Sequence, residues 1–133
     1  MSDSTKKGHV YWGNPGHMPS RYGFVRRKDY RKALKKLGCE PHPTPNSDAC
    51  VELFCVNNTD VCLFSIDEDL VDSSSDVAVI GMVTHEAVHI FQFMCADVGE
   101  KDPSPEFEAY TIQAITQHLL WAMEEAGVFV LGA

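Results

Sequence analysis

Apolar and polar positions change along the chain in blocks that predict a helix, a hairpin and two further helices. Across residues 30–37 the apolar side chains recur at i, i+3, i+4 and i+7, and Gly38 follows as a stop signal. This predicts a short basic amphipathic helix. Two apolar runs, ACVELFCV and DVCLFSID, then flank a polar turn at Asn57-Asn58-Thr59, which predicts an antiparallel hairpin.

Two long helices are predicted in the C-terminal half. The first begins at Asp76 as its N-cap and runs for about twenty residues to Ala96. The second opens at Ser104-Pro105 and continues to Glu125 or Ala126. The chain is therefore expected to be a single α+β domain, in which a short hairpin or sheet packs on two long C-terminal helices, with the basic helix nearer the N-terminus.

Segments rich in glycine, proline or acid are predicted as loops. Residues 11–24 contain three glycines and two prolines, so residues 1–25 are predicted to be an irregular N-terminal segment. DEDLVDSSSD, residues 67–76, is predicted to be an acidic loop. The metal-site helices discussed below are assigned to residues 76–126 of the one domain, residues 1–133.

Composition favours a water-soluble, cytoplasmic protein. No apolar segment follows a basic region at the N-terminus, and no run is judged long enough to span a bilayer. The five cysteines are an odd number, which favours reduced thiols over a disulfide framework. Cys50, Cys55 and Cys62 lack a CxxC pair, so they are interpreted as small apolar strand residues rather than as a structural zinc site.

Charge is distributed unevenly. Residues 1–38 carry ten Lys or Arg against two Asp, a net +8, and residues 39–133 carry one Lys against seventeen acids, a net −16. A basic segment of this kind can pair with the acidic body of its own chain or bind nucleic acid or an acidic protein. Pairing within the chain is the favoured interpretation, because the segment also carries an apolar stripe.

The stretch GMVTHEAVHIFQF places two histidines and a glutamate in the first long helix. His85 and His89 are four residues apart, so their rings lie side by side on a helix, at the spacing that a tetrahedral zinc needs. Glu86 lies where it can take a proton from a metal-bound water. The helix is apolar around most of its circumference and is expected to be buried, where unpartnered imidazoles are costly. The competing interpretation is a core helix whose histidines are satisfied by hydrogen bonds.

A third metal ligand is expected on the second long helix. Its candidates are Glu106, Glu108 and His118. Glu108 falls on the most apolar arc, where a carboxylate needs a strong partner, whereas Glu106 falls on a more polar arc. The residues themselves leave the choice open.

HEAVH followed by a helix that bears a glutamate resembles the gluzincin class of zinc peptidases. In that class a small residue follows the ligand glutamate at +3, and Ala109 stands there relative to Glu106. The resemblance therefore implies a minimal zincin-like fold and a Zn²⁺ held by His85, His89 and Glu106, with Glu108 as the alternative third ligand. Tyr110 departs from the family pattern, which has Asp or Asn at +4.

HExxHxxQ together with ExxAYxIQ also resembles small phage- and prophage-encoded proteins described as metallopeptidases. The resemblance covers roughly residues 76–120. It implies hydrolysis of a peptide or protein substrate, with Glu86 as general base and the strand CLFSI as the edge that pairs with an extended peptide. Candidates for stabilising the oxyanion are Tyr110, His118, Tyr22 and His17.

Two other functions compete with a peptidase. The chain can be a catalytically inactive zincin-fold protein that binds a host partner, in which case Glu86 is dispensable. It can also be a nucleic-acid-associated protein that uses RRKDYRKALKK as an electrostatic footprint, as SprT-type zincins act at DNA. The acidic remainder of the chain disfavours the second alternative. The oligomeric state is left open.

Overall fold

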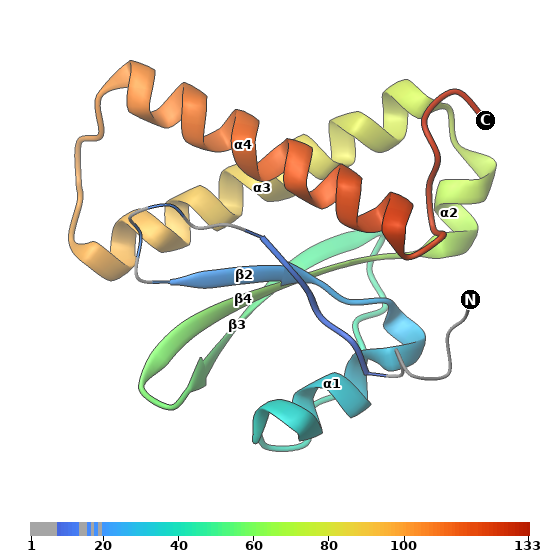
Figure 1. Ribbon diagram of the computed structural model, residues 1–133, viewed down its shortest axis with the longest axis horizontal. Helices are drawn as coiled ribbons and strands as arrows, with labels where there is room; N and C mark the ends of the chain where they lie inside the picture. Colours follow the sequence, from blue (N-terminus) through green and yellow to red (C-terminus); the bar gives the residue numbers. More distant parts are fainter. Residues whose placement is uncertain (1–7, 14–15, 17, 19) are drawn as a thin grey trace.

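The computed structural model describes residues 8–13, 16, 18 and 20–133, which form a four-stranded mixed sheet with helices on both faces (Figure 1). The predicted α+β class is confirmed. The strands are β1 (Tyr11–Trp12), β2 (Arg21–Phe24), β3 (Ala49–Val56) and β4 (Thr59–Ile66), in the order β1-β2-β4-β3. The helices are the 3-10 turn η2 (Arg27–Asp29), α1 (Tyr30–Leu37), α2 (Glu68–Ser73), α3 (Asp76–Val98) and α4 (Pro105–Glu125).

The predicted hairpin is confirmed as β3 and β4. Asn57 and Asn58 at its tip have φ of 51° and 64°, the left-handed conformation that asparagine tolerates and that a two-residue hairpin turn requires. β4 also pairs in parallel with β2, in a register that sets Arg21 beside Val61. β4 is therefore a central strand, and β3 is an edge strand.

Two predicted loops are wrong. The segment predicted to be irregular contains β1 and β2, which pair antiparallel with each other. The predicted acidic loop contains α2, whose N-cap Asp67 accepts hydrogen bonds from the backbone N–H groups of Asp69 and Leu70. β1 and β2 are stabilised by pairing with other strands, and α2 is stabilised by its own N-cap, so each forms in a segment whose composition favours a loop.

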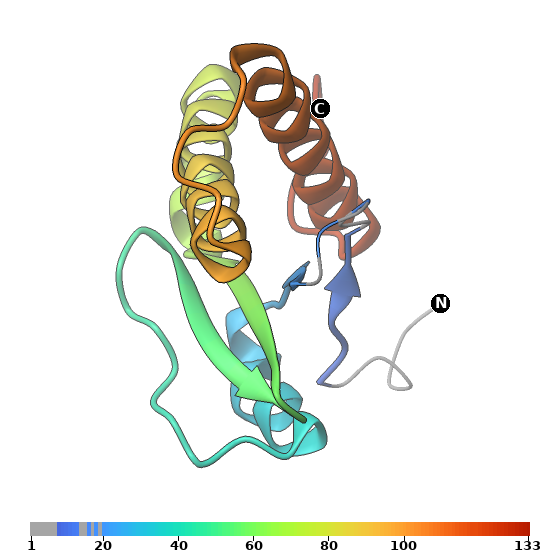
Figure 2. The same cartoon turned by 90° about the vertical axis from the view of Figure 1, so that its left-hand side faces the viewer.

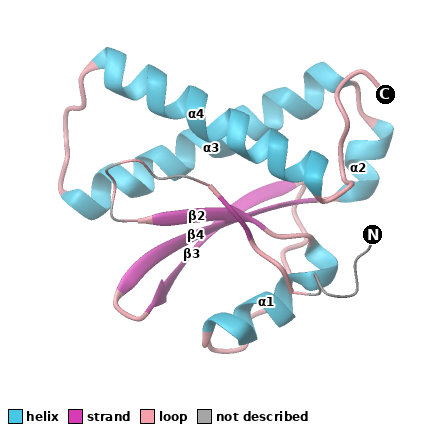
Figure 3. Ribbon diagram, viewed as in Figure 1, coloured by secondary structure: helices cyan, strands magenta, loops and turns pink. Residues whose placement is uncertain are grey.

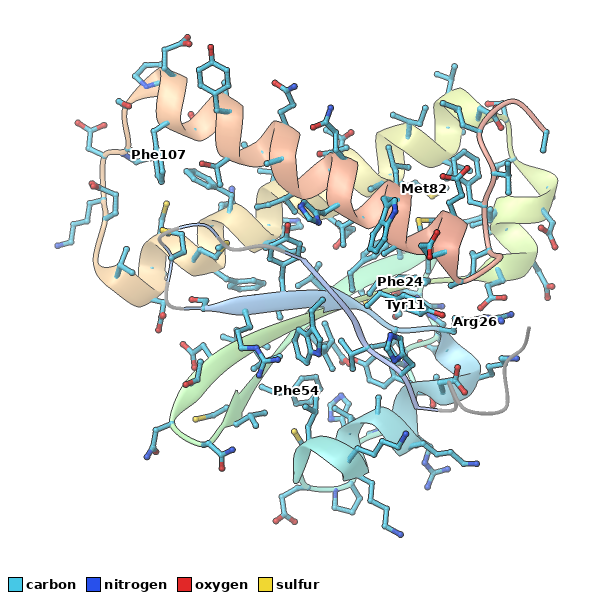
Figure 4. The ribbon with its side chains drawn as sticks, viewed as in Figure 1. Tyr11, Phe24, Arg26, Phe54, Met82 and Phe107 are labelled. Atoms are coloured by element: carbon cyan, nitrogen blue, oxygen red, sulfur yellow. The ribbon has the colours of Figure 1, made fainter. Side chains whose placement is uncertain are left out.

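The sheet separates two apolar clusters. α3 and α4 cover one face, and α1 covers the other (Figures 2 and 3). Phe24 belongs to the cluster under α3 and α4, whereas Phe54 packs with the cluster on the α1 side (Figure 4). The sheet therefore separates the residues under α3 and α4 from the residues under α1.

The two long helices begin and end close to their predicted positions. α3 is capped by Ser75, one residue before the predicted Asp76, and ends at Val98, two residues after the predicted end, where Gly99 adopts a φ of 74°. The Ser104 side chain caps α4 by accepting from the Phe107 N–H, as predicted.

α3 also corrects one expectation. The helix has 23 residues, and its most apolar stretch of 18 residues has a mean hydropathy of 1.4. By length and composition it could cross a membrane. In this fold it packs on the sheet and beside α4, and eight of its side chains are buried, Glu86 among them. Its apolar composition is that of a core helix.

Candidate metal centre

The imidazoles of His85 and His89 converge on each other one turn apart on α3. Their Nε2 atoms are 3.2 Å apart, and the two rings are nearly perpendicular, at 79°. Two nitrogens that each lie about 2.0–2.1 Å from one tetrahedral zinc are separated by about 3.3 Å. The pair therefore has the spacing of two ligands to one metal ion.

Gln92 fixes the protonation of one ring. Nδ1 of His89 lies 3.0 Å from the Oε1 of Gln92, and an amide oxygen only accepts, so Nδ1 carries the proton. The lone pair of His89 is then on Nε2, the atom that faces His85. A hydrogen bond from the remote ring nitrogen to an oxygen is also what holds metal-binding histidines in position.

The expectation that both imidazoles are buried is wrong. The side chain of His85 is 69% exposed, and His89 is half-buried. The polar arc of α3 faces solvent because the sheet and α4 contact the other sides of the helix (Figure 2). A metal on this pair is therefore accessible to water and to a ligand from outside.

Glu86, in contrast, turns inward. It is 8% exposed, its Oε2 lies 3.9 Å from the Nε2 of His85, and its carboxylate accepts the backbone N–H of Val51 on β3. Burial raises the pKa of the Glu86 carboxyl, while the two histidines and the Val51 N–H lower it in part. A carboxylate with a raised pKa beside two convergent imidazoles suits a general base.

A cleft of about 300 Å³ opens beside His85 and Glu86. Its other walls are Asp48 and Ala49 at the start of β3, and Gly81 and Met82 on α3. A side chain built at Gly81 meets no described atom within 4 Å, so this glycine widens the cleft.

The sequence did not single out Asp48, which lines the cleft, or Val51, whose backbone N–H contacts Glu86. Both precede α3 by more than twenty residues, and the fold brings them to the site by setting β3 against the helix. The only sequence feature that could have indicated a role for Asp48 is its position in a loop directly before a strand.

The edge of the sheet at this site is β3. The strand CLFSI, predicted to be the edge, lies in β4 and is paired on both sides. β3 pairs only with β4 among the described strands, and the Val51 N–H that contacts Glu86 belongs to it. The hairpin was located correctly and the wrong strand of it was chosen, because the sequence does not show that β2 occupies the far side of β4.

The third ligand is not assembled with the histidine pair. Within the described residues, no three His, Cys, Asp or Glu side chains form a metal-binding group. Glu106 is exposed in the first turn of α4, and Glu108 lines a separate hollow of about 580 Å³ with Gln92 and Cys95. The structure thus brings together His85, His89 and Glu86.

The beginning of α4 rests on α3 through an aromatic contact. The rings of Phe91 and Phe107 are 5.8 Å apart, and Phe107 lies between the two carboxylates in sequence (Figure 4). Gln92 links Glu108 to the histidine pair, because it lines the same hollow as Glu108 and contacts His89.

The remaining sequence candidates lie elsewhere. Tyr110 is 68% exposed on α4, and the rings of His118 and Tyr22 meet edge to face at 6.4 Å. His17 lies outside the described residues.

The interpretation of the three strand cysteines as buried apolar residues is confirmed for Cys62 and is wrong for Cys55. Cys62 is buried in the cluster under α3 and α4, Cys55 is exposed, and Cys50 is half-buried and contacts Ser65 at 3.9 Å. Ser65 is three residues from Cys62 on one strand, so Cys50 and Cys62 lie on opposite faces of the sheet.

The centre therefore consists of two converging imidazoles, a buried carboxylate and an adjacent cleft at a sheet edge. No protein-family model, no curated protein and no solved structure matches this chain. Its function has to be argued from this geometry and from the motif that carries it.

Proposed function

We propose that the chain is a zinc-dependent metallopeptidase. The observation that carries the proposal is the 3.2 Å separation of the two Nε2 atoms, with the buried carboxylate of Glu86 directly beside them. A histidine pair at this spacing suits zinc, and zinc sites of this composition activate water for hydrolysis.

Each residue has a distinct role in the proposal. His85 and His89 would hold the metal, and Glu106, or Glu108 as the alternative, would complete the site by moving towards them from the first turn of α4. A zinc ion bound there would supply a Lewis acid for the scissile carbonyl and for the attacking water. Glu86 accepts the proton of that water and delivers it to the leaving amine.

The free edge of β3 supports a peptide as substrate. An edge strand exposes backbone N–H and C=O groups that an extended peptide can pair with. The cleft beside His85 and Glu86 begins at Ala49, the first residue of this strand. A peptide laid along β3 therefore leads to the metal centre.

A cytoplasmic location belongs to the same proposal. The five cysteines, all of them in the described part of the chain, are free thiols. Free thiols in this number suit a reducing compartment.

The first experiment measures zinc per chain by elemental mass spectrometry on protein purified with and without added zinc. Wild type and the control His118→Ala are expected to hold about one zinc per chain, since two convergent imidazoles in each bind it, and His89→Ala is expected to lose it. Wild-type protein that stays folded and metal-free in excess zinc contradicts the proposal. The histidine pair is then a hydrogen-bonded surface feature.

Glu86→Gln separates a peptidase from a binding protein. The variant is expected to keep its zinc and to hydrolyse a quenched fluorescent peptide library about 10²–10⁴-fold more slowly, the usual loss when a general base is removed. Full zinc occupancy with equal or absent hydrolysis in wild type and variant favours the inactive zincin-fold binding protein.

The third ligand is assigned by comparing Glu106→Gln, Glu108→Gln and Asp48→Asn. The variant that lowers zinc affinity most identifies the ligand, because each substitution removes a charge and keeps the size of the side chain. Asp48 is included because it shares the cleft with His85.

A further inference from the structure

A second hollow lies on the α1 side of the sheet, away from the metal centre. Its volume is about 550 Å³, and it is formed by α1 and the chain that follows the helix. Leu34, Cys39 and Pro41 give it apolar walls, and the exposed cations Arg31, Lys32 and Lys35 surround it. An apolar recess with a positive rim is a binding surface for a ligand that is both apolar and anionic.

The cations of this rim are not engaged with the acidic body of the chain. Arg26, at the base of the basic segment, does pair internally, with a two-pronged contact to Glu68 at 2.8 and 3.1 Å. No carboxylate of residues 8–13, 16, 18 or 20–133 lies within ion-pair distance of Arg31, Lys32 or Lys35. The expected internal pairing of the basic segment is therefore made at Arg26, and among the described residues the rim cations have no carboxylate partner.

α1 is oriented by its apolar face. Tyr30, Ala33 and Leu34 are buried against the sheet, so the charged positions between them project into solvent. Five of the eight residues of α1 are exposed or half-buried, and four of these are Lys or Arg. The helix holds its positive charge on one outward surface.

A half-buried polar network fixes the far wall of the hollow. The carboxylate of Glu52 accepts from the Tyr30 hydroxyl and contacts the Nε2 of His42 at 2.8 Å. The His42 ring also meets Phe54 edge to face, with centroids 5.4 Å apart. His42 is therefore held in place by two contacts, and a preformed wall lowers the entropic cost of binding.

We propose that this hollow, the α1 recess, binds an acidic peptide segment. An apolar side chain of the peptide enters between Leu34, Cys39 and Pro41, and flanking carboxylates pair with Arg31 and Lys35. This binding site is separate from the proposed peptidase centre, because α1 and α3 lie on opposite faces of the sheet (Figure 1).

A peptide fits this surface better than nucleic acid does. The eight residues of α1 span about 12 Å, so only a few phosphates of a duplex could face the rim. Residues 39–133 carry a net charge of −16, which repels a long polyanion that extends past α1. A short peptide can keep its charges within the rim, and its side chain uses the apolar recess that a duplex leaves empty.

The test is fluorescence anisotropy with labelled decapeptides at low salt. The probe peptide has two glutamates on each side of a central leucine, a second peptide replaces the leucine with serine, and a third replaces the glutamates with glutamines. The double variant Arg31→Glu/Lys35→Glu is compared with Lys28→Glu/Lys101→Glu, which changes the net charge equally at exposed cations outside the recess. Circular dichroism checks that each variant is folded, and Arg31→Gln/Lys35→Gln replaces the first pair if it is not.

Wild type is expected to bind the leucine peptide more tightly than the other two. The recess variant is expected to bind it about tenfold more weakly, since two exposed ion pairs of up to about 1 kcal/mol each are lost. The control variant is expected to match wild type. An equal loss in both variants overturns the proposal in favour of general charge attraction, and tighter binding of a 20-base-pair duplex than of the peptide overturns it in favour of nucleic acid. The metal variant His89→Ala should bind the peptide normally, so this result is independent of the peptidase proposal.

Discussion

Ile90 offers a direct test of how α3 is built, because it is fully buried and directly follows a proposed metal ligand. Its side chain has no exposed surface and packs in the cluster between the sheet, α3 and α4. Replacing it with alanine removes buried methyl groups and leaves a cavity that two helices and a sheet cannot fully close. Ile90→Ala is therefore expected to lower the free energy of unfolding by about 2–5 kcal/mol.

Val77→Ala is the matched control, since Val77 lies on the same helix and is 80% exposed. Its effect is expected to stay within about 0.5 kcal/mol. Both values are obtained from urea unfolding followed by far-UV circular dichroism in EDTA, so that metal does not contribute. A loss at Ile90 below about 1 kcal/mol would refute the packing of α3 against the sheet.

The zinc affinity of the milder variant Ile90→Val tests a second part of the reasoning. The separation of His85 and His89 is set by four residues of helix, and Ile90 points away from them into the core. Ile90→Val is expected to cost about 0.5–1.5 kcal/mol of stability and to leave zinc affinity unchanged, as measured by competition with a chromophoric chelator. A large loss of zinc affinity would mean that core packing, rather than helix geometry, positions the pair.

Three further predictions concern groups away from the metal centre. Burial raises the pKa of the Cys62 thiol to about 12, so this thiol should resist maleimide at pH 8 until the protein unfolds, while the exposed Cys55 is labelled at once. The contribution of Cys62 to stability should fall as the pH rises from about 9 towards 12, and labelling of Cys62 itself in the native protein, located by peptide mapping, would contradict this. Tyr30→Phe removes the hydroxyl that donates to Glu52, and the unfolding free energy should fall by about 1–3 kcal/mol; an unchanged urea midpoint would show that the network is not formed. Arg26→Gln breaks the half-buried contact with Glu68 and should cost about 1 kcal/mol, less at high salt, and a loss that does not depend on salt would point to packing instead.

The elements that the sequence predicts well are those whose signals are local. The apolar spacing of α1, the Asn57-Asn58 turn and the Ser104-Pro105 start of α4 each depend on a few adjacent residues. β2 is missed because its stability comes from pairing with β4, forty residues later, and its own sequence contains a glycine. Local composition cannot report a partner at that distance.

The same distinction between local signals and distant partners explains which parts of the candidate site the sequence predicts. The spacing of His85 and His89 follows from the helix that the sequence predicts. Their exposure does not, because an apolar helix has several sides and the sequence does not say which neighbours cover them. The Val51 N–H at Glu86 and the carboxylate of Asp48 in the cleft come from tertiary packing, and the local sequence pattern does not show that either lies beside α3.

The parallel pairing of β2 with β4 has a consequence for how the chain can be shortened. β2 covers the backbone of one side of β4, a strand whose residues 61–66 are all buried. A chain lacking residues 1–25 would expose that side as an apolar edge with unpaired N–H and C=O groups, the usual template for aggregation between molecules. β2 thus protects the strand from other copies of the protein, and during synthesis β2 has no partner on this side until β4 has been made.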